Sequence, residues 1–304
     1  MQSLWRKNTQ IESLSKANHS YEEFIFPSGR QAIMHAVSSM KRGERVAVAE
    51  YSSQCVFNAV AKYATPMPVK EAVENNINID VIMVYEQWGW AFNNDILDEV
   101  LNKYSKIIFD CVDSPDAHIR YKNMDSVIVS LSKCLGLKGG AIFLENGVLQ
   151  RSMCTLGDYL GLDIENLDHI HMINSYLNTT SHIGDLSEID VLHELEKETY
   201  SRRENLKLFA NSSLSRNWND WMFESINEDC SAGIVPLFKD KRIEQLQKIK
   251  IDIKKNLGIE SEVYNFNWSG SPISFDYRPC IAFPIHGDIA NMQDSIKVIE
   301  NMKV

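Results

Sequence analysis

Short apolar runs alternate with segments of helical periodicity through the first half of the chain. Residues 27–42 begin with a turn and continue with apolar residues at helical spacing. The elements predicted next are a strand at 45–49, a helix at 53–63, a strand at 79–85, a helix at 94–104, a strand at 106–110 and two apolar strands, SVIVSLS and GAIFL. Apolar strands that alternate with amphipathic helices predict an α/β fold, with a mainly parallel sheet sandwiched by helices.

The pattern changes after about residue 150. A largely helical middle extends from 150 to 215, and the last third has the order strand, helix, strand, strand, helix. This order is typical of a smaller α/β domain. We therefore predict an N-terminal arm at 1–25, a large domain at 26–200 and a small C-terminal domain at 201–304.

Composition narrows the classes of function. The chain has 304 residues, and its 44% hydrophobic and 24% charged residues are typical of globular proteins. A net charge of -10 without a basic stripe argues against nucleic-acid binding. No apolar stretch approaches the roughly 20 residues that span a bilayer, so no membrane partner is expected. Six scattered cysteines without a CxxC pair favour reduced thiols and a cytoplasmic location.

Chemistry-bearing residues stand at the predicted strand ends, where ligands of open α/β sheets bind. Ser28 and Gly29 open the first helix, either as an anion site or as an ordinary N-cap. Asp110 closes an apolar strand, as a partner for a cation or as a turn former. Lys133 follows SVIVSLS directly, either as a solvated strand end or as a desolvated, nucleophilic amine.

These three features complement one another. A phosphate cradle, a buried acid and a buried lysine on successive strand ends are the parts that hold pyridoxal 5'-phosphate (PLP). The acid would pair with the pyridinium nitrogen, and the lysine would form the aldimine. We therefore expect PLP as the cofactor and no resident metal, since His169 and His171 in LDHIHMI lack an apparent acid or cysteine partner.

Six segments resemble one family, the fold-type I PLP-dependent aminotransferases of the DegT/DnrJ sugar-aminotransferase kind. The segments are FPSGRQAIMHAV, RVAVAEYSSQCVFNAV, VIMVYEQWGW, IIFDCVDSPD, VSLSKCLGLKGGAIFL and CIAFPIHGDIANMQDSIKVIENM. The resemblance implies the PLP-dependent transferase fold of type I and Lys133 as the aldimine lysine and proton shuttle. It implies Asp110 as the ligand of the ring nitrogen. The residues that it implies for the phosphate are Ser28, Gly29, Arg30 and Ser130.

The chain departs from the family pattern at several cofactor positions. Asp113 stands where the family tends to have Gln or His near the phenolic oxygen, so an acceptor replaces a donor. Ser53 occupies the usual stacking position, and Tyr51 is expected to supply the ring face instead. The family adds an asparagine from the neighbouring subunit of a homodimer, and Asn178 is our candidate for it.

Three residues are predicted to bind substrate. Tyr85 aligns with a histidine of the family's loop, and Trp88 follows closely. Arg278 stands where an arginine could bind a carboxylate, with a structural ion pair as the alternative. We interpret Arg202 and Arg203 as surface or interface residues.

The resemblance implies an aminotransferase that moves an amino group from an amino acid such as glutamate to a keto acceptor, a nucleotide-linked keto sugar. The partners expected are these two small molecules and a second copy of the chain with shared active sites. Two alternatives stay open. One is another PLP reaction, by a lyase, decarboxylase or condensing enzyme, and the other is a non-catalytic binding protein that keeps the fold.

Overall fold

The computed structural model describes residues 26, 28–50, 52–92, 94–136, 140–151, 188–287 and 289–302. The predicted arm at 1–25 lies outside the described residues, as do Tyr51 and Asn178.

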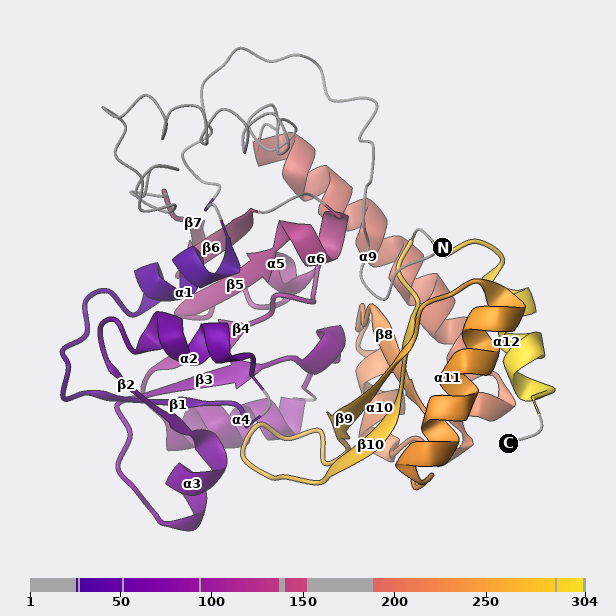
Figure 1. The fold of residues 1–304 in the computed structure, drawn as a ribbon. Helices are drawn as coiled ribbons and strands as arrows, with labels where there is room; N and C mark the ends of the chain where they lie inside the picture. The colour runs from indigo at the N-terminus through magenta and orange to yellow at the C-terminus, as the bar shows by residue number, and fades with distance from the viewer. Residues whose placement is uncertain are drawn as a thin grey trace, which may run out of the picture.

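A seven-stranded sheet forms the N-terminal half (Figure 1). Its strands are β1 (Arg45–Val48), β2 (Thr65–Pro68), β3 (Val81–Tyr85), β4 (Ile107–Asp110), β5 (Ser126–Ser130), β6 (Ala141–Glu145) and β7 (Val148–Leu149). They lie in the order β2-β1-β3-β4-β5-β6-β7. The pairs from β2 to β5 are parallel, whereas β6 is antiparallel to both β5 and β7. The predicted mainly parallel sheet is confirmed.

Helices cover both faces of this sheet because its central strands are apolar on both sides. The helices on one face are α1 (Gly29–Ala36) and α2 (Gln54–Val60), and those on the other are α3 (Val69–Glu74), α4 (Asn94–Lys103) and α5 (Ala117–Arg120). In β4, Ile108 packs on the side of α1, while Ile107 and Phe109 pack on the side of α4. Consecutive side chains of a strand point to opposite faces, so an uninterrupted apolar run fits a sheet covered twice.

Several short elements were not predicted, among them β2 and α3, and one predicted helix ends early. The strand β2 has the sequence TPMP, and its prolines cannot donate to a neighbouring strand. The structure accommodates them at the edge of the sheet, where β2 pairs only with β1. α3 follows directly, and α1 ends at Ala36 rather than near residue 42.

The sequence context of Lys133 suggested that it ends a strand, but the structure places it in a short helix. β5 ends at Ser130, and the chain turns at once into the short helix α6 (Leu131–Leu135). Gly136 closes this helix with a φ of 71°, a left-handed conformation that glycine adopts without strain. Lys133 therefore projects from a helical turn set directly on the carboxyl end of β5.

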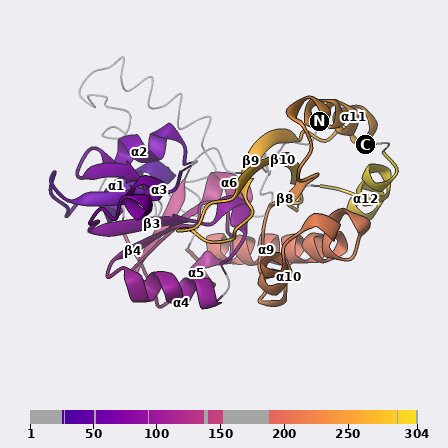
Figure 2. The ribbon, with the colours of Figure 1, turned by 90° about the horizontal axis from the view of Figure 1, so that it is seen from below.

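The C-terminal part is built around a second, three-stranded antiparallel sheet in the order β8-β10-β9 (Figure 2). Its elements are α9 (Glu188–Ala210), a 3-10 turn (Ser213–Asn217), α10 (Asp220–Asn227), β8 (Ile234–Leu237), α11 (Ile243–Leu257), β9 (Glu262–Asn267), β10 (Tyr277–Pro284) and α12 (Met292–Glu300). The order from β8 to α12 is the one predicted. The boundary predicted at residue 200 falls inside α9, so the division into domains stays a prediction. Across the described ranges, no helix has the length and apolarity that a membrane crossing requires.

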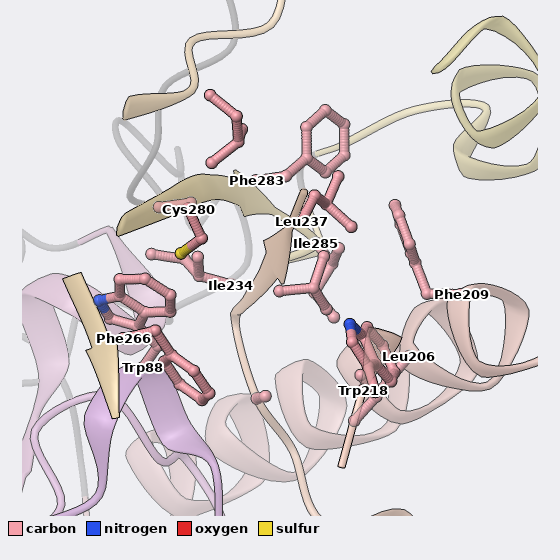
Figure 3. Close-up of a cluster of buried hydrophobic side chains, with 14 of the residues drawn as sticks. Trp88, Leu206, Phe209, Trp218, Ile234, Leu237, Phe266, Cys280, Phe283 and Ile285 are labelled. Atoms are coloured by element: carbon pink, nitrogen blue, oxygen red, sulfur yellow. The ribbon is translucent and has the colours of Figure 1, made fainter. Parts of the chain in front are cut away.

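The hydrophobic core of the C-terminal part includes Trp88, which follows β3 of the large sheet (Figure 3). Trp88 lies in the 3-10 turn Gln87–Gly89 after β3, and its ring stacks on Phe266 of β9 at 5.1 Å between centroids. The next residue, Gly89, has a φ of 86°, and a Cβ there would lie 2.9 Å from the carbonyl oxygen of Asp113. This close approach requires glycine.

A buried ionic network also joins the two parts. Asp116, 2% exposed, accepts hydrogen bonds from Arg120, from Arg203 of α9 and from Ser231 just before β8. Burial alone would raise the pKa of Asp116, but these three donors outweigh burial and lower it. Arg203, predicted to lie on a surface or interface, is instead partly buried against Asp116.

We expect Asp116→Asn to destabilise the protein by about 1.5–3 kcal/mol at neutral pH, because it removes the carboxylate that accepts from Arg203 and leaves Arg120 paired with Glu86. The stabilisation from a carboxylate with a lowered pKa is present above the unfolded value of about 3.9 and is lost as pH falls. The penalty should therefore shrink below about pH 4, as measured by urea unfolding across pH. A penalty that is constant with pH would contradict this account.

Candidate active site

Three strands bring polar residues together at their carboxyl ends. Tyr85, the last residue of β3, lies beside Asp110, the last residue of β4, and Asp110 in turn pairs with Ile128 of β5. Ser130 ends β5, and Lys133 follows in α6. The residues predicted from separate strand ends thus converge at one edge of the parallel sheet.

A cavity of about 700 Å³ opens at this edge. The residues predicted for the site that line it are Ser28, Gly29, Arg30, Tyr85, Trp88, Asp110, Ser130 and Lys133. The opposite wall comes from the C-terminal part, with Ile243 and Gln247 of α11 and Tyr264 and Asn265 of β9. The cavity therefore lies between the two halves of the chain.

The first helix presents its N-terminus to the cavity. Ser28 is the N-cap of α1, and its Oγ accepts a hydrogen bond from the backbone N–H of Gln31 at 3.3 Å. Ser130 also lines the cavity, and its Oγ lies 3.0 Å from the Oγ of Ser132. Free N–H groups and the helix dipole favour an anion here, and serine hydroxyls can donate to it. These residues suit a phosphate group.

Asp110 is 3% exposed and carries an oxygen, Oδ1, that has no hydrogen-bond partner in the described part of the chain. Burial raises the pKa of its carboxyl to about 7, although Lys133 acts in the opposite direction. A buried acceptor without a donor is costly unless a ligand supplies one. The protonated ring nitrogen of PLP would supply such a donor and would keep the carboxyl ionised. Asp110 therefore fits the cofactor that the sequence predicts.

Lys133 forms an ion pair with Asp113, with 3.0 Å between Nζ and Oδ1. The other carboxylate oxygen of Asp113 accepts a hydrogen bond from the Tyr85 hydroxyl at 2.6 Å. Burial is the largest single influence and would lower the pKa of Lys133, but the charge and hydrogen bond of Asp113 together with the charge of Asp110 outweigh burial and raise it. Asp113 lies behind the cavity wall rather than among the lining residues.

Arg202 is a site residue that sequence reasoning misplaced. It is 2% exposed and donates hydrogen bonds to the carbonyl oxygens of Asp113 at 2.7 Å and Lys133 at 3.3 Å. Its Nε lies 2.6 Å from Glu198, which is also buried. The signal was present in the sequence, because both residues continue the apolar stripe of α9 at helical spacing from Leu195 to Leu206.

Two further residues that the sequence analysis did not select shape the cavity wall. The Gln87 side chain donates to the carbonyl of Asn265 at 2.8 Å and accepts from the N–H of Asn267 at 3.0 Å. Tyr264 packs edge-on against Trp88 at 6.3 Å between centroids. The positions of Gln87 and Tyr264 in the sequence follow no recognisable spacing, so only the fold shows that they line the cavity.

Arg278 lies apart from the other predicted residues. Its guanidinium pairs with Asp240 at 2.8 Å and Asp276 at 2.7 Å, and its side chain is about half exposed. It does not line the cavity, although its neighbour Pro279 does. The structural ion pair, which was the alternative, is the arrangement observed, and a role for Arg278 in substrate binding stays a prediction.

A family model described as "Putative PLP-dependent aminotransferase" matches residues 12–265. A comparison with curated protein sequences gave no match.

Several solved structures share the fold. NtdA from Bacillus subtilis, with bound cofactor PMP, is 14% identical with a TM-score of 0.56, over 91% of this chain and 73% of that one. A DegT DnrJ EryC1 StrS aminotransferase from Brucella abortus is 15% identical with a TM-score of 0.54, over 91% and 84%. PseC from Helicobacter pylori, an aminotransferase involved in pseudoaminic acid biosynthesis, is 14% identical with a TM-score of 0.54, over 91% and 86%. The predicted PLP fold of type I is confirmed.

Asp110→Asn should make the stability of the cofactor-free protein less dependent on pH. A carboxyl whose pKa rises to about 7 on folding stabilises the fold fully below about pH 4 and loses that stabilisation as pH rises to about 7. Three pKa units correspond to about 4 kcal/mol, so the variant should gain up to this amount at about pH 8. Urea unfolding measures it, with exposed Asp98→Asn as the control. An unchanged pH slope would refute the expectation.

Arg202→Ala should cost about 3–5 kcal/mol of unfolding free energy, because it removes a guanidinium that is buried against the buried carboxylate of Glu198. Lys207→Ala on the same helix is the matched control, since its pair with Glu204 is about half exposed on both sides. That control should change stability by less than about 1 kcal/mol. Equal effects of the two substitutions would show that the Arg202 contacts contribute little.

Proposed function

Because the chain belongs to the family of PLP-dependent aminotransferases, we propose that it transfers an amino group from glutamate or a similar amino acid to a keto sugar. The observation that carries the proposal is one cavity in which Lys133, the unsatisfied Asp110 oxygen and the N-terminus of α1 meet. Each would engage a different part of the cofactor.

The residues divide the binding of PLP among themselves. Ser28, Gly29 and Ser130 would hold the phosphate, with the Arg30 backbone beside them. Asp110 would accept the hydrogen bond from the ring nitrogen. When bound, PLP supplies an aldehyde that condenses with amines and a ring that accepts electrons.

Lys133 would bind the cofactor covalently through Nζ and then act as the general base and acid. Once substrate displaces it, its amine would accept the proton from the substrate Cα and return it to the reacting system. A positioned base and acid contributes about 10²–10⁴-fold to such a reaction. Tyr85 and Trp88 line the cavity and would contact the substrate.

The opposite wall supports a hydroxylated acceptor. Gln247 and Asn265 offer neutral side chains that can both donate and accept hydrogen bonds, and Tyr264 and Trp88 offer aromatic faces. Such a surface can bind a sugar ring through its hydroxyl groups and its C–H face. A nucleotide-linked keto sugar as the acceptor is supported by the resemblance to sugar aminotransferases.

The proposal includes a cytoplasmic homodimer with shared active sites. In it, Asn178 of one protomer would reach the cofactor of its partner, and Tyr51 would face the ring. The five cysteines in the described ranges carry free thiols, in keeping with a reducing compartment. The division into an arm at 1–25, a large domain at 26–200 and a small domain at 201–304 also belongs to the proposal.

We expect purified protein mixed with PLP to develop a visible absorption band that is absent from Lys133→Ala. Borohydride should fix the cofactor on Lys133, as read by peptide mass spectrometry, and glutamate should shift the band of the wild type. Activity of Lys133→Ala should fall at least about 100-fold, whereas exposed Lys70→Ala should match the wild type. A wild type that never binds PLP would refute the proposed enzyme. A bound cofactor that responds to no amino donor would instead favour another PLP reaction.

A further inference from the structure

Asp113 is held at three points. Its Oδ1 lies 3.0 Å from Lys133 Nζ, its Oδ2 accepts from the Tyr85 hydroxyl at 2.6 Å, and its carbonyl oxygen accepts from Arg202 at 2.7 Å. Gly89 packs so closely on the same carbonyl that no side chain fits between them. The carboxylate therefore has one fixed position, and that position faces the amine of Lys133.

The pair lies in a setting that strengthens charge interactions. Asp113 is 1% exposed, and Lys133 is about one third exposed toward the cavity. A pair shielded from water on one side interacts more strongly than a surface pair. Tyr85 can serve Asp113 only as a donor near neutral pH, because burial and the Asp113 charge raise the pKa of its hydroxyl.

Other charged and titratable groups face Lys133 from each neighbouring element. Asp110 from β4 and Cys134 from α6 act on its charge, Arg202 from α9 contacts its backbone carbonyl, and Tyr85 from β3 and Arg30 from α1 line the same cavity. The charge of Asp110 acts on Lys133 in the same direction as that of Asp113. Asp113 exerts the larger effect and makes the direct contact.

We propose that Asp113, fixed by Tyr85, is a positioning residue that holds Lys133 as an ammonium ion in the cofactor-free protein and accepts its proton when PLP is captured. This inference rests on the proposed function, because it concerns the loading of that same site. It also gives a role to the acid that stands where the resembled family tends to have Gln or His.

The proton transfer is balanced within the pair. The N–H bond of the Lys133 ammonium breaks, a new O–H bond forms on Asp113 Oδ1, and an amine and a neutral carboxylic acid result. The amine has the lone pair that adds to an aldehyde. Two charges disappear together, so the transfer adds no net charge to the buried site. Tyr85 remains able to donate to Oδ2 throughout.

The test compares the wild type with Asp113→Asn and Asp113→Gln in the cofactor-free protein. The reactivity of Lys133 toward trinitrobenzenesulfonate is followed across pH by peptide mass spectrometry. In the wild type, half-reactivity should lie above the ordinary lysine value of about 10.4. Removing the charge should shift it down by about 1–3 pH units. Asp113→Glu should restore the high value, and Glu74→Gln, which removes the acid of an exposed lysine pair, should leave it unchanged.

The same variants are then mixed with PLP, and the pH dependence of the capture rate is measured from the absorption band. We expect the capture profile of the two amide variants to move to lower pH together with lysine reactivity. Identical capture profiles in the wild type and both variants would overturn the inference while leaving the proposed enzyme intact. Failure of every form to bind PLP would overturn both. If neither amide variant folds, a wild-type half-reactivity at or below about pH 10.4 overturns the inference by itself.

Discussion

The ion pair between Arg202 and Glu198 is the interaction on which the geometry of the site depends. Two buried ions are costly to desolvate, and they persist only when each satisfies further groups. Arg202 does so by donating to the carbonyls of Asp113 and Lys133, and Glu198 accepts from the N–H of Gly287. One helix thereby fixes the turn after β4, the turn after β5 and a loop of the C-terminal part.

This anchoring explains why three ionisable side chains stay close together instead of moving apart. Asp110, Asp113 and Lys133 lie close together at the ends of β4 and β5, and both carboxyl groups are buried. Their carboxylates would separate or bind solvent if the turns could move. Because Arg202 of α9 holds the backbone of Asp113 and Lys133 from behind, Lys133 and Asp110 line the cavity, and Asp110 Oδ1 has no hydrogen-bond partner in the described ranges. A ligand that supplies the missing hydrogen-bond donor can therefore bind without first having to order these side chains.

The sequence predicted the sheet and its main chemistry well, because both have strong local signals. Strands buried on two faces are continuous apolar runs, and polar residues at their ends stand out against them. The edge strand β2 was missed because its two prolines oppose strand formation, and only the absence of a neighbour on one side makes them acceptable. Arg202 was misplaced because charge usually means exposure, and its carbonyl partners lie 69 and 89 positions away. The ion pair of Arg278 with Asp240 could not be read from the sequence for a similar reason, since the two residues are 38 positions apart.

Trp88 connects the two halves of the molecule. It follows β3 in the chain, it lines the cavity, and its ring stacks within the core of the C-terminal part. An indole in this position is an optical sensor built into the protein. Its emission, together with that of the other tryptophans of the chain, would respond to energy transfer into a coloured cofactor across the cavity and to any change in how the two halves pack. Intrinsic tryptophan fluorescence could therefore report cofactor binding and changes in the packing of the two halves without an added label.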